Sequence, residues 1–359
     1  MMRQLDSNDY ARYAKQISLS EIGAAGQLKL KNAKVLCIGA GGLGTPLLQY
    51  LTAAGVGRIG IIDHDVVELS NLQRQIIYRH NDIGKFKVTA AKNNLQDLNP
   101  SICFDIYAEK FASHHVRSII AEYDIVADCT DHLANRYLVN EVCVELDKPF
   151  VFAGITRYHG QCMFFHGKSG PCFNCMFPEN LAVAILPDCN AAGVLGVLPG
   201  ILGTMQANMI LQYILQLQRH GTGQLFTLDI LDFALQRYQV TQDPECQICI
   251  YGRRTCNDEA ITPEQLNRKL HLHENFLLLD VRSPAEHAVG HLGGKLIPLP
   301  ELSQRLDELN PELPVIIYCH SGQRSQAAVK ILQQHQFKSV AYLQGGLASC
   351  QHVCAIIRP

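Results

Sequence analysis

The sequence predicts an α/β protein: a doubly wound domain with a mixed sheet, followed by a second and smaller α/β domain. Short apolar strands alternate with helical patterns over residues 34–154, which is typical of a parallel sheet covered by helices on both faces. The pattern becomes antiparallel after Gly154, and a new alternation begins after a polar stretch at 252–258. A length of 359 residues, 47% apolar and 18% charged, suits two to three domains with buried cores.

The first domain is predicted over residues 1–251. Residues 1–33 have an amphipathic helical pattern with a break at Gly23 and Gly26. The predicted strands are 34–40, 58–63, 102–108, 124–129 and 149–154, and the predicted helices are 45–54, 85–98 and 132–146. Antiparallel strands follow at 159–166 and 224–240. Between them, an apolar stripe at helical spacing predicts core or subunit contacts: Met205, Met209, Ile210, Ile214 and Leu217.

The second domain is predicted over residues 261–359, after a linker at 252–260. A helix is expected after Thr262, and strands are expected at 276–281, 315–319 and 339–343. This stretch of about 100 residues is long enough for a separate α/β unit.

Composition and charge exclude several classes of protein. Lys and Arg number 31 and Asp and Glu number 33, so the net charge of -2 lacks the basic excess of a nucleic-acid-binding protein. The longest apolar stretch, 191–205, is short and interrupted by Pro199 and glycines, so no membrane span is expected. Residues 1–10 lack the apolar core of a secretory signal, which favours a cytoplasmic protein. In that compartment the 14 cysteines are not expected to form a disulfide framework.

A glycine motif, Gly39-x-Gly41-x-x-Gly44 with a further glycine at Gly42, lies between a predicted strand and a predicted helix. Asp63 ends the next strand, 19 residues after Gly44. In this setting backbone N–H groups and a helix N-terminus face phosphate, while the acid binds ribose hydroxyls. The motif predicts a Rossmann-like nucleotide site, and on its own it leaves a nicotinamide cofactor open.

Three further features favour a nucleoside triphosphate with Mg²⁺. They are a polar loop with Ser70, Asn71 and Arg74, then Lys87 on the next helix, and Asp131 just after a strand. Cations offset the charge of phosphates, and a carboxylate at the carboxyl edge of the sheet positions the metal. Hydride transfer with a nicotinamide requires none of these groups.

Residues 8–250 resemble the MoeB/ThiF/HesA family, the bacterial relatives of ubiquitin-activating enzymes. The resemblance is carried, in order, by segments 39–44 and 69–75, by Lys87 and by segment 129–131. It implies that ATP adenylates the C-terminal glycine of a small ubiquitin-like protein. By this resemblance Asp63 would bind the ribose, Arg74 and Lys87 the phosphates, and Asp131 the Mg²⁺.

Two positions depart from that family. An arginine of its N-terminal segment enters the partner subunit's site, and here Lys15 takes that position. The charge is carried over but the forked geometry is not. Because the resemblance places Lys15 in the site of the partner subunit, it also implies that the protein forms a homodimer. The asparagine that usually follows the Cys-Thr-Asp motif is His132, so that contact is not carried over.

Two cysteine pairs, Cys172-x-x-Cys175 and Cys246-x-x-Cys249, lie about 70 residues apart. Each pair can supply two thiolates to one ion, and together they complete a closed tetrahedral zinc site. A redox pair is the alternative for a single Cys-x-x-Cys, but two pairs favour Zn²⁺, as the family resemblance also implies. The ion would be structural.

Cys189 lies in a stretch of small residues, 186–194. One interpretation is an incidental cysteine. The other is a nucleophile that meets the acyl adenylate or receives sulfur, and the family places a conditional catalytic cysteine in this segment. Glycine and small side chains permit the motion that such a loop needs. We expect Cys189 to be catalytic, with the thiolate as its reactive form.

In the second domain, Cys319 and Arg324 belong to a loop between a predicted strand and a predicted helix. Backbone N–H groups at a helix N-terminus favour a thiolate or a bound anion, and Arg324 adds positive charge. Phosphatases place five residues between the cysteine and the arginine. The four residues here form a smaller ring that suits one sulfur atom on the cysteine, which is the rhodanese pattern.

Residues 260–359 resemble the rhodanese family further in segments 279–282, 286–291 and 345–346. Asp280 and Arg282 are expected to form an ion pair that braces the loop. Gly293 stands where such domains carry proline and Cys350 where many carry tryptophan, and both are interpreted as packing changes.

Together these motifs predict an enzyme that adenylates a sulfur carrier and transfers sulfur to it. A persulfide on Cys319 would attack the acyl adenylate, and the product would be a thiocarboxylate. The expected cofactors are ATP, Mg²⁺ and Zn²⁺. The expected partners are a carrier of the MoaD or ThiS type ending in Gly-Gly, and a sulfur donor such as a cysteine desulfurase or thiosulfate. Molybdopterin synthesis, thiamine synthesis, tRNA thiolation and cysteine synthesis all use such carriers, and the sequence does not select one of them.

Two alternatives stay open at this point. One is a non-catalytic docking module that binds nucleotide and carrier and relies on another sulfur donor. The other is an NAD-dependent oxidoreductase, which Arg74, Lys87 and Asp131 disfavour.

Overall fold

The computed structural model describes residues 4–111, 113–167, 169–178, 193–217, 222–246, 248–250, 259–271, 274–335, 337 and 339–350. The chain divides into two compact units, Met1–Gly252 and Arg253–Pro359. Within the described residues, no helix has both the length and the apolar character needed to cross a membrane.

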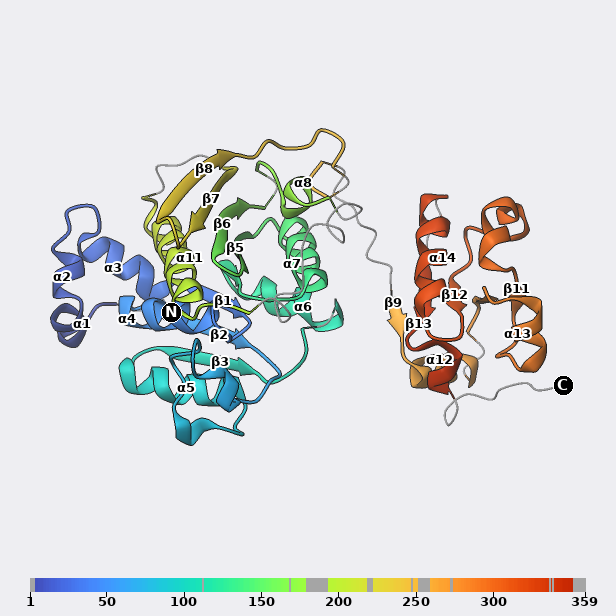
Figure 1. Cartoon of the computed structure of the whole chain (residues 1–359), viewed down its shortest axis with the longest axis horizontal. Coiled ribbons are helices and arrows are strands. Elements are labelled where there is room, and N and C mark those ends of the chain that lie inside the picture. Colours follow the sequence, from blue (N-terminus) through green and yellow to red (C-terminus); the bar gives the residue numbers. More distant parts are fainter. Residues whose placement is uncertain are drawn as a thin grey trace. The chain divides into compact units, whose positions relative to one another are not determined.

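The first unit is built on a mixed sheet with the strand order β3-β2-β1-β4-β5-β6-β7-β8 (Figure 1). The strands are β1 (Lys34–Ile38), β2 (Arg58–Ile62), β3 (Cys103–Tyr107), β4 (Ile125–Asp128), β5 (Pro149–Thr156), β6 (His159–His166), β7 (Gln224–Asp229) and β8 (Ala234–Gln239). The pairs from β3 to β5 are parallel, with Val35 opposite both Ile59 and Ile125. The pairs from β5 to β8 are antiparallel. The predicted mixed α/β sheet is therefore confirmed.

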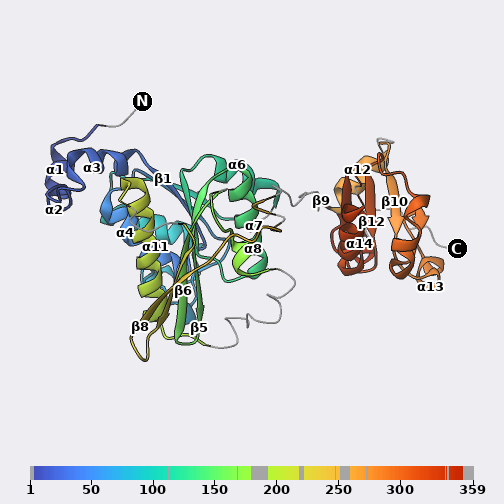
Figure 2. The same ribbon diagram turned by 90° about the horizontal axis from the view of Figure 1, so that it is seen from above.

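Helices cover both faces of this sheet (Figure 2). One face carries α3 (Gly23–Asn32), α4 (Gly44–Ala54), α5 (Lys87–Leu98) and α11 (Val197–Leu215), and the other carries α6 (Ser113–Ala121), α7 (Leu133–Glu145) and α8 (Phe173–Met176). The pleat of β1 shows why two cores form, since Val35 and Cys37 belong to the first cluster while Leu36 and Ile38 belong to the second.

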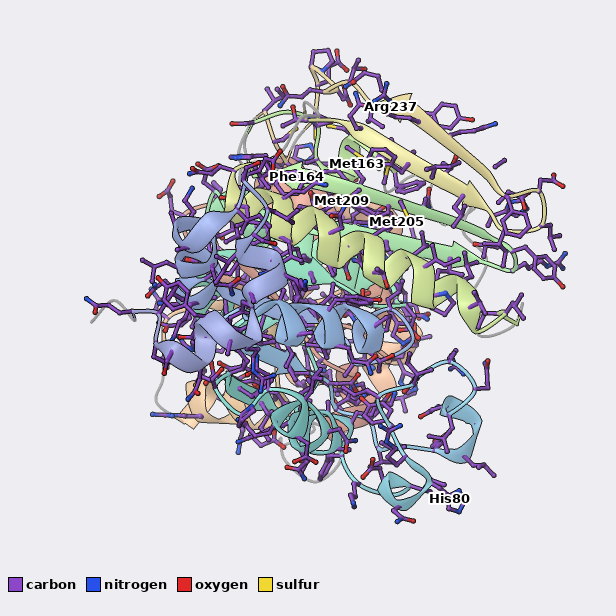
Figure 3. The ribbon with its side chains drawn as sticks, turned by 90° about the vertical axis from the view of Figure 1, so that its left-hand side faces the viewer. His80, Met163, Phe164, Met205, Met209 and Arg237 are labelled. Carbon is purple, nitrogen blue, oxygen red and sulfur yellow. The ribbon has the colours of Figure 1, made fainter. Side chains whose placement is uncertain are left out.

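Helix α11 is longer than the apolar stripe in its sequence. It begins at Val197, so Pro199 lies in its first turn, where no intrahelical N–H bond is lost. Figure 3 shows Met205 and Met209 of this helix beside Phe164 of β6, and all three pack against the core under α11. The stripe is therefore largely core.

The N-terminal segment forms α1 (Ser7–Arg12), α2 (Ala14–Ile17) and α3. The predicted break falls at Gly23, where φ is +56° and α3 begins. The break predicted at Gly26 is wrong, because Gly26 is buried inside α3. A Cβ at Gly26 would lie 2.9 Å from Ile22 and 3.0 Å from Leu215, so close packing explains this glycine.

The second unit has a parallel sheet with the strand order β11-β10-β12-β13-β9. Its elements are β9 (Glu259–Ile261), α12 (Pro263–His271), β10 (Leu277–Asp280), α13 (Pro284–Val289), β11 (Lys295–Leu296), β12 (Val315–Tyr318), α14 (Gln323–Gln334) and β13 (Val340–Leu343). Short 3-10 turns complete both units: η1 (Leu69–Asn71), η2 (His80–Asp82), η3 (Leu299–Gln304), η4 (Leu306–Glu308) and η5 (Gly346–Cys350). Separate apolar clusters lie on the two faces of this sheet, so the unit has its own core.

Candidate functional site

The glycine motif lies where the winding of the first sheet reverses. From β1 the chain proceeds to β2 and β3 on one side, and later to β4 and β5 on the other. Ligands of such sheets bind at this point, beyond the carboxyl ends of the strands. A cavity of about 790 Å³ lies there, bordered by the strand-end residues Ile38, Ile62 and Cys129. Its size is within the usual range for small-molecule sites.

Most residues expected to bind nucleotide line this cavity: Gly39, Gly41, Gly42, Asp63, Ser70, Asn71, Arg74, Lys87 and Asp131. Gly44 and Lys15 are not among the lining residues. Lys15 is exposed on α2. The structure therefore brings together residues from five separate segments of the sequence.

Gly39 and Gly44 are required by close backbone packing. Gly39 has a φ of +94°, which ends β1 at Ile38, two residues earlier than predicted. A Cβ at Gly44 would lie 2.1 Å from the carbonyl oxygen of Gly39. Without that atom, α4 can start directly against the end of β1, and its N-terminus lies beside the cavity.

The carboxylate of Asp63 is held by backbone on both oxygens. The N–H of Ala40 donates to Oδ2 and the N–H of Asp65 donates to Oδ1, each at 2.8 Å. Each oxygen keeps a second lone pair, so the carboxylate can still accept hydrogen bonds from two hydroxyl groups. This arrangement suits a ribose.

Lys87 is a buried cation on the cavity wall, with a side chain that is 7% exposed. Its Nζ lies 2.8 Å from Oδ2 of Asp65, and its backbone N–H donates to the carbonyl of Asp65 at 2.9 Å. Burial raises the pKa of Asp65, but the hydrogen bond and charge of Lys87 outweigh it and lower the pKa overall. The carboxylate therefore stays ionised and fixes the ammonium in place.

The loop that contains η1 presents one cation and one amide. Asn71 is buried, and its Oδ1 accepts the N–H of Glu68 at 3.0 Å, so it shapes the turn. The guanidinium of Arg74 donates to the carbonyl of Ser70 at 3.1 Å. Gln75 was missed by sequence reasoning, although it follows Arg74 directly. It lines the cavity, is 3% exposed, and its Oε1 has no hydrogen-bond partner among the described residues.

Two acids lie at the end of β4, and they differ in access. Asp128 is 1% exposed, burial raises its pKa, and its Oδ1 accepts from the hydroxyl of Thr130 at 2.7 Å. The side chain of Asp131 is 59% exposed and lines the cavity, so Asp131 is the acid that a cation can reach. Arg136, also missed, donates to the carbonyl of Thr130 at 3.0 Å and lies over the ring of Phe152. It thereby fixes the turn that carries Asp131.

Other cavity residues follow no motif in the sequence: Glu109, Lys110, Phe111, Asn135 and Arg157. Val194, the last residue of the small-residue stretch 186–194, also lines the cavity. Arg157 has a φ of +55° and forms an isolated parallel bridge with Val194. Cys189 belongs to segment 179–192, which lies outside the described residues.

The two Cys-x-x-Cys pairs converge on one point, as predicted. Their four sulfur atoms lie within 4.8 Å of one another. The Sγ–Sγ distances are 3.9 Å for Cys172–Cys175, 3.6 Å for Cys172–Cys246 and 3.5 Å for Cys175–Cys249. A tetrahedral zinc ion with metal–sulfur bonds of about 2.3 Å has sulfur atoms about 3.8 Å apart. The donor set and its dimensions therefore fit Zn²⁺.

Amide groups around the four sulfurs complete this centre. The N–H of Asp243 donates to Cys175 at 3.4 Å, and the side-chain amide of Gln242 donates to Cys249 at 3.4 Å. N–H donors of this kind stabilise thiolate ligands. The centre joins α8 to the segment after β8. Its four cysteines complete a tetrahedral set and leave no open position for a substrate, so a bound ion would be structural.

In the second unit, the Cys319 loop connects β12 to α14. Cys319 is 1% exposed, and its Sγ accepts the N–H of Gly322 at 3.1 Å. Burial raises the pKa of the Cys319 thiol, but hydrogen bonds from Ser325, Gly322 and Ser321 outweigh burial and lower the pKa overall. The N–H of Leu347, in η5, also donates to the carbonyl of Cys319 at 2.8 Å. The loop is thus a rigid cradle for a thiolate.

Two ion pairs lie near this loop, one of them beside Tyr318 and the other on Arg324. Asp280 and Arg282 form the expected buried pair, with Nη2 of Arg282 2.6 Å from Oδ2 of Asp280. Arg324 makes a second pair that was not predicted: its two terminal nitrogens lie 2.7 and 2.6 Å from the carboxylate oxygens of Glu286. Glu286 is the first residue of segment 286–291, so the acid was visible in the sequence, but its pairing with Arg324 was not.

Two positions of unusual residue type have separate explanations. Cys350 is fully buried in an apolar cluster and acts as packing, as expected. Gly293 has a φ of +87°. Since proline is fixed near −65°, the change at Gly293 alters the backbone course and is more than a packing change.

Comparisons with known proteins agree with this two-part organisation. Residues 13–248 match the ThiF family, and residues 262–352 match the rhodanese-like domain. The adenylyltransferase and sulfurtransferase MOCS3 of Xenopus laevis is 34% identical over 96% of this chain and 86% of its own. The probable molybdopterin-synthase adenylyltransferase of Porphyra purpurea is 34% identical over 96% of this chain and 94% of its own.

The first unit has relatives of its own. The sulfur carrier protein adenylyltransferase of Thermus thermophilus is 41% identical over 66% of this chain and 90% of its own. A crystal structure of E. coli MccB with ATP superposes with a TM-score of 0.59 at 24% identity, covering 69% of this chain and 75% of MccB, and shows a shared fold. The chain therefore belongs to the ThiF family and carries a rhodanese-like domain after its ThiF domain.

Proposed function

We propose that this chain uses ATP to adenylate the C-terminal glycine of a small ubiquitin-like sulfur-carrier protein and then delivers sulfur to that glycine. The observation that carries the proposal is the presence, on one chain, of a cavity suited to a triphosphate and a loop whose hydrogen bonds lower the pKa of Cys319 and so favour its thiolate. Relatives named adenylyltransferase and sulfurtransferase, which match 92–96% of this chain, support both activities.

In the first reaction a carboxylate oxygen of the carrier attacks the α-phosphorus of ATP, and pyrophosphate leaves. Both reactants are anions, so the site must neutralise charge and align the attack. Lys87 and Arg74 would offset phosphate charge, while Asp63 would hold the ribose and the N-terminus of α4 would face phosphate. Asp131 would hold Mg²⁺, which adds to the charge neutralisation when bound.

In the second reaction the Cys319 thiolate attacks the sulfane sulfur of a donor and becomes a persulfide. The outer sulfur attacks the acyl carbon, AMP leaves, and an acyl disulfide joins the carrier to Cys319. A thiol then cleaves the sulfur–sulfur bond, which releases the thiocarboxylate and leaves a disulfide between that thiol and Cys319. An external dithiol reduces this disulfide back to two thiols and is itself oxidised to a disulfide. We assign the attacking thiol to Cys189 on sequence grounds, with thioester formation by Cys189 as the alternative.

The remaining parts of the proposal concern stability and partners. Zn²⁺ held by the four cysteines would be structural. A cysteine desulfurase or thiosulfate would supply sulfur, and a homodimer would place the charge of Lys15 in the partner subunit's site. The names of the relatives favour a carrier of molybdopterin synthesis, with thiamine synthesis as the alternative.

The adenylation step is tested by ATP–pyrophosphate exchange that depends on a Gly-Gly-ended carrier. Lys87→Met should lower kcat/KM for exchange by about 10²-fold or more, as for other removed transition-state cations. Lys85→Met is the matched control, since Lys85 pairs with Asp82 and does not line the cavity. Absence of exchange with every such carrier, or NADH bound beside Asp63, would refute this half of the proposal.

The sulfur step is tested separately by transfer from a sulfane-sulfur donor to cyanide. Cys319→Ala should abolish this transfer, whereas Cys103→Ser, at an exposed free cysteine, should leave it intact. Exchange activity without any sulfur on Cys319 would favour the docking module that relies on another donor.

A further inference from the structure

The charges around the Cys319 loop cancel within the described residues. Arg324 is bound by both oxygens of Glu286, and the hydrogen bond from Arg324 holds the pKa of Glu286 well below its usual range. Arg282, which lies over the ring of Tyr318, is bound by buried Asp280 in the same way. Two arginines and two carboxylates leave no net charge.

The loop itself adds no fixed cation. Between Cys319 and Arg324 the sequence is His320, Ser321, Gly322 and Gln323. The nearby His287 is also held by Asp280, with Nδ1 2.9 Å from Oδ2. The cradle therefore stabilises one thiolate through N–H groups and the start of α14, without excess positive charge for a further anion.

We infer that Glu286 determines the charge class of the sulfur donor: by neutralising Arg324 it directs the Cys319 loop to donors with at most one negative charge, such as a persulfide on a cysteine side chain, and against a dianion such as thiosulfate. This inference rests on the proposed sulfurtransferase function. In each case the Cys319 thiolate attacks the outer sulfur of the donor. The sulfur–sulfur bond of the donor breaks, and its electron pair leaves with a thiolate, a sulfinate or sulfite.

The helix geometry makes Glu286 a suitable position for a test. Glu286 is the N3 residue of α13, where its carboxylate accepts from the N–H of Ser283 at 3.1 Å in a capping box. Glutamine also closes such a box, so Glu286→Gln removes the charge and keeps the cap. Arg324 then gains a free positive charge at a site that is 38% exposed.

The experiment compares two donors that transfer the same sulfane sulfur, thiosulfate with two negative charges and methanethiosulfonate with one, using cyanide as acceptor and the full chain. In Glu286→Gln, the kcat/KM for thiosulfate should rise about five- to tenfold because its KM falls. The kcat/KM for methanethiosulfonate should rise only about two- to threefold, since its single charge interacts less strongly with a half-exposed arginine. Glu301→Gln, which breaks an exposed pair with Arg305, is the matched control and should leave the ratio of the two donors unchanged.

A double variant separates charge from structural damage. Arg324→Gln alone leaves Glu286 unpaired and should disfavour thiosulfate further, whereas Glu286→Gln with Arg324→Gln should return the donor ratio to the wild-type value. If the ratio in Glu286→Gln equals that of the wild type while sulfur still loads onto Cys319, the inference is overturned. If no donor loads sulfur onto wild-type Cys319, the proposed sulfur transfer itself fails.

Discussion

Replacing Gly44 with alanine should destabilise the first unit, although the same change inside a helix usually stabilises by about 0.5–1 kcal/mol. The new Cβ would lie 2.1 Å from the carbonyl oxygen of Gly39. Carbon–oxygen contacts are usually no shorter than about 3.3 Å, so α4 or the glycine loop must move by about 1 Å. Overpacking of this kind costs about 1–3 kcal/mol.

Subtracting the helix gain from the overpacking cost leaves a net loss of up to about 2.5 kcal/mol, which lowers the melting temperature of a unit this size by up to about 10 °C. Because Gly39 borders the cavity, the same shift should weaken ATP binding by about tenfold or more. Calorimetry of the full chain measures both quantities, as thermal unfolding and as ATP titration.

Gly200→Ala is the matched control for this change. Gly200 also lies in a helix, α11, but no atom lies within 4 Å of its new Cβ. This variant should be as stable as the wild type or slightly more so, with unchanged ATP binding. If Gly44→Ala is as stable as Gly200→Ala and binds ATP like the wild type, the packing argument for the glycine motif is wrong.

Two more predictions concern the cysteines. Metal analysis should find one zinc ion per chain. Cys175→Ser should lose this ion together with several kcal/mol of stability, whereas Cys103→Ser should keep both. If Cys175→Ser retains its zinc and its stability, the proposed zinc centre is wrong. Alkylation of Cys319 by iodoacetamide should titrate at lower pH than alkylation of an ordinary free thiol, because hydrogen bonds in the folded state lower the pKa of Cys319. The lowered pKa stabilises the fold above the ordinary value, and this contribution is lost as pH falls through the folded pKa. Ser325→Ala should move the titration upward, and a wild-type midpoint at or above the ordinary value would refute the cradle.

Much of the fold was predictable because its signals are local. The alternation of strands and helices over residues 34–154 requires only the period of the apolar residues, and the strands form close to the predicted positions. Errors arose where a local signal has two meanings. Gly26, for example, was interpreted as a break in the helical pattern, but it allows close packing against Ile22 inside α3.

The candidate site was predictable where a motif is contiguous in the chain. Gly39, Asp63, Arg74 and Lys87 were found in this way, and all four line one cavity. Gln75 and Arg136 were missed. Gln75 is buried at the cavity and Arg136 donates to the carbonyl of Thr130, and neither feature leaves a recognisable pattern in a single sequence.

The sequence by itself determined the two α/β units, the glycine loop, the four cysteines and the length of the Cys319 loop, because each depends on residue type at short spacing. Only the tertiary structure decided which charged side chains pair with one another. Arg324 was expected to add positive charge to its loop, yet Glu286 of another helix neutralises it, and Lys87 is held by Asp65 across 22 positions. An ionic interaction depends on distance in space, which the order of residues along the chain does not specify.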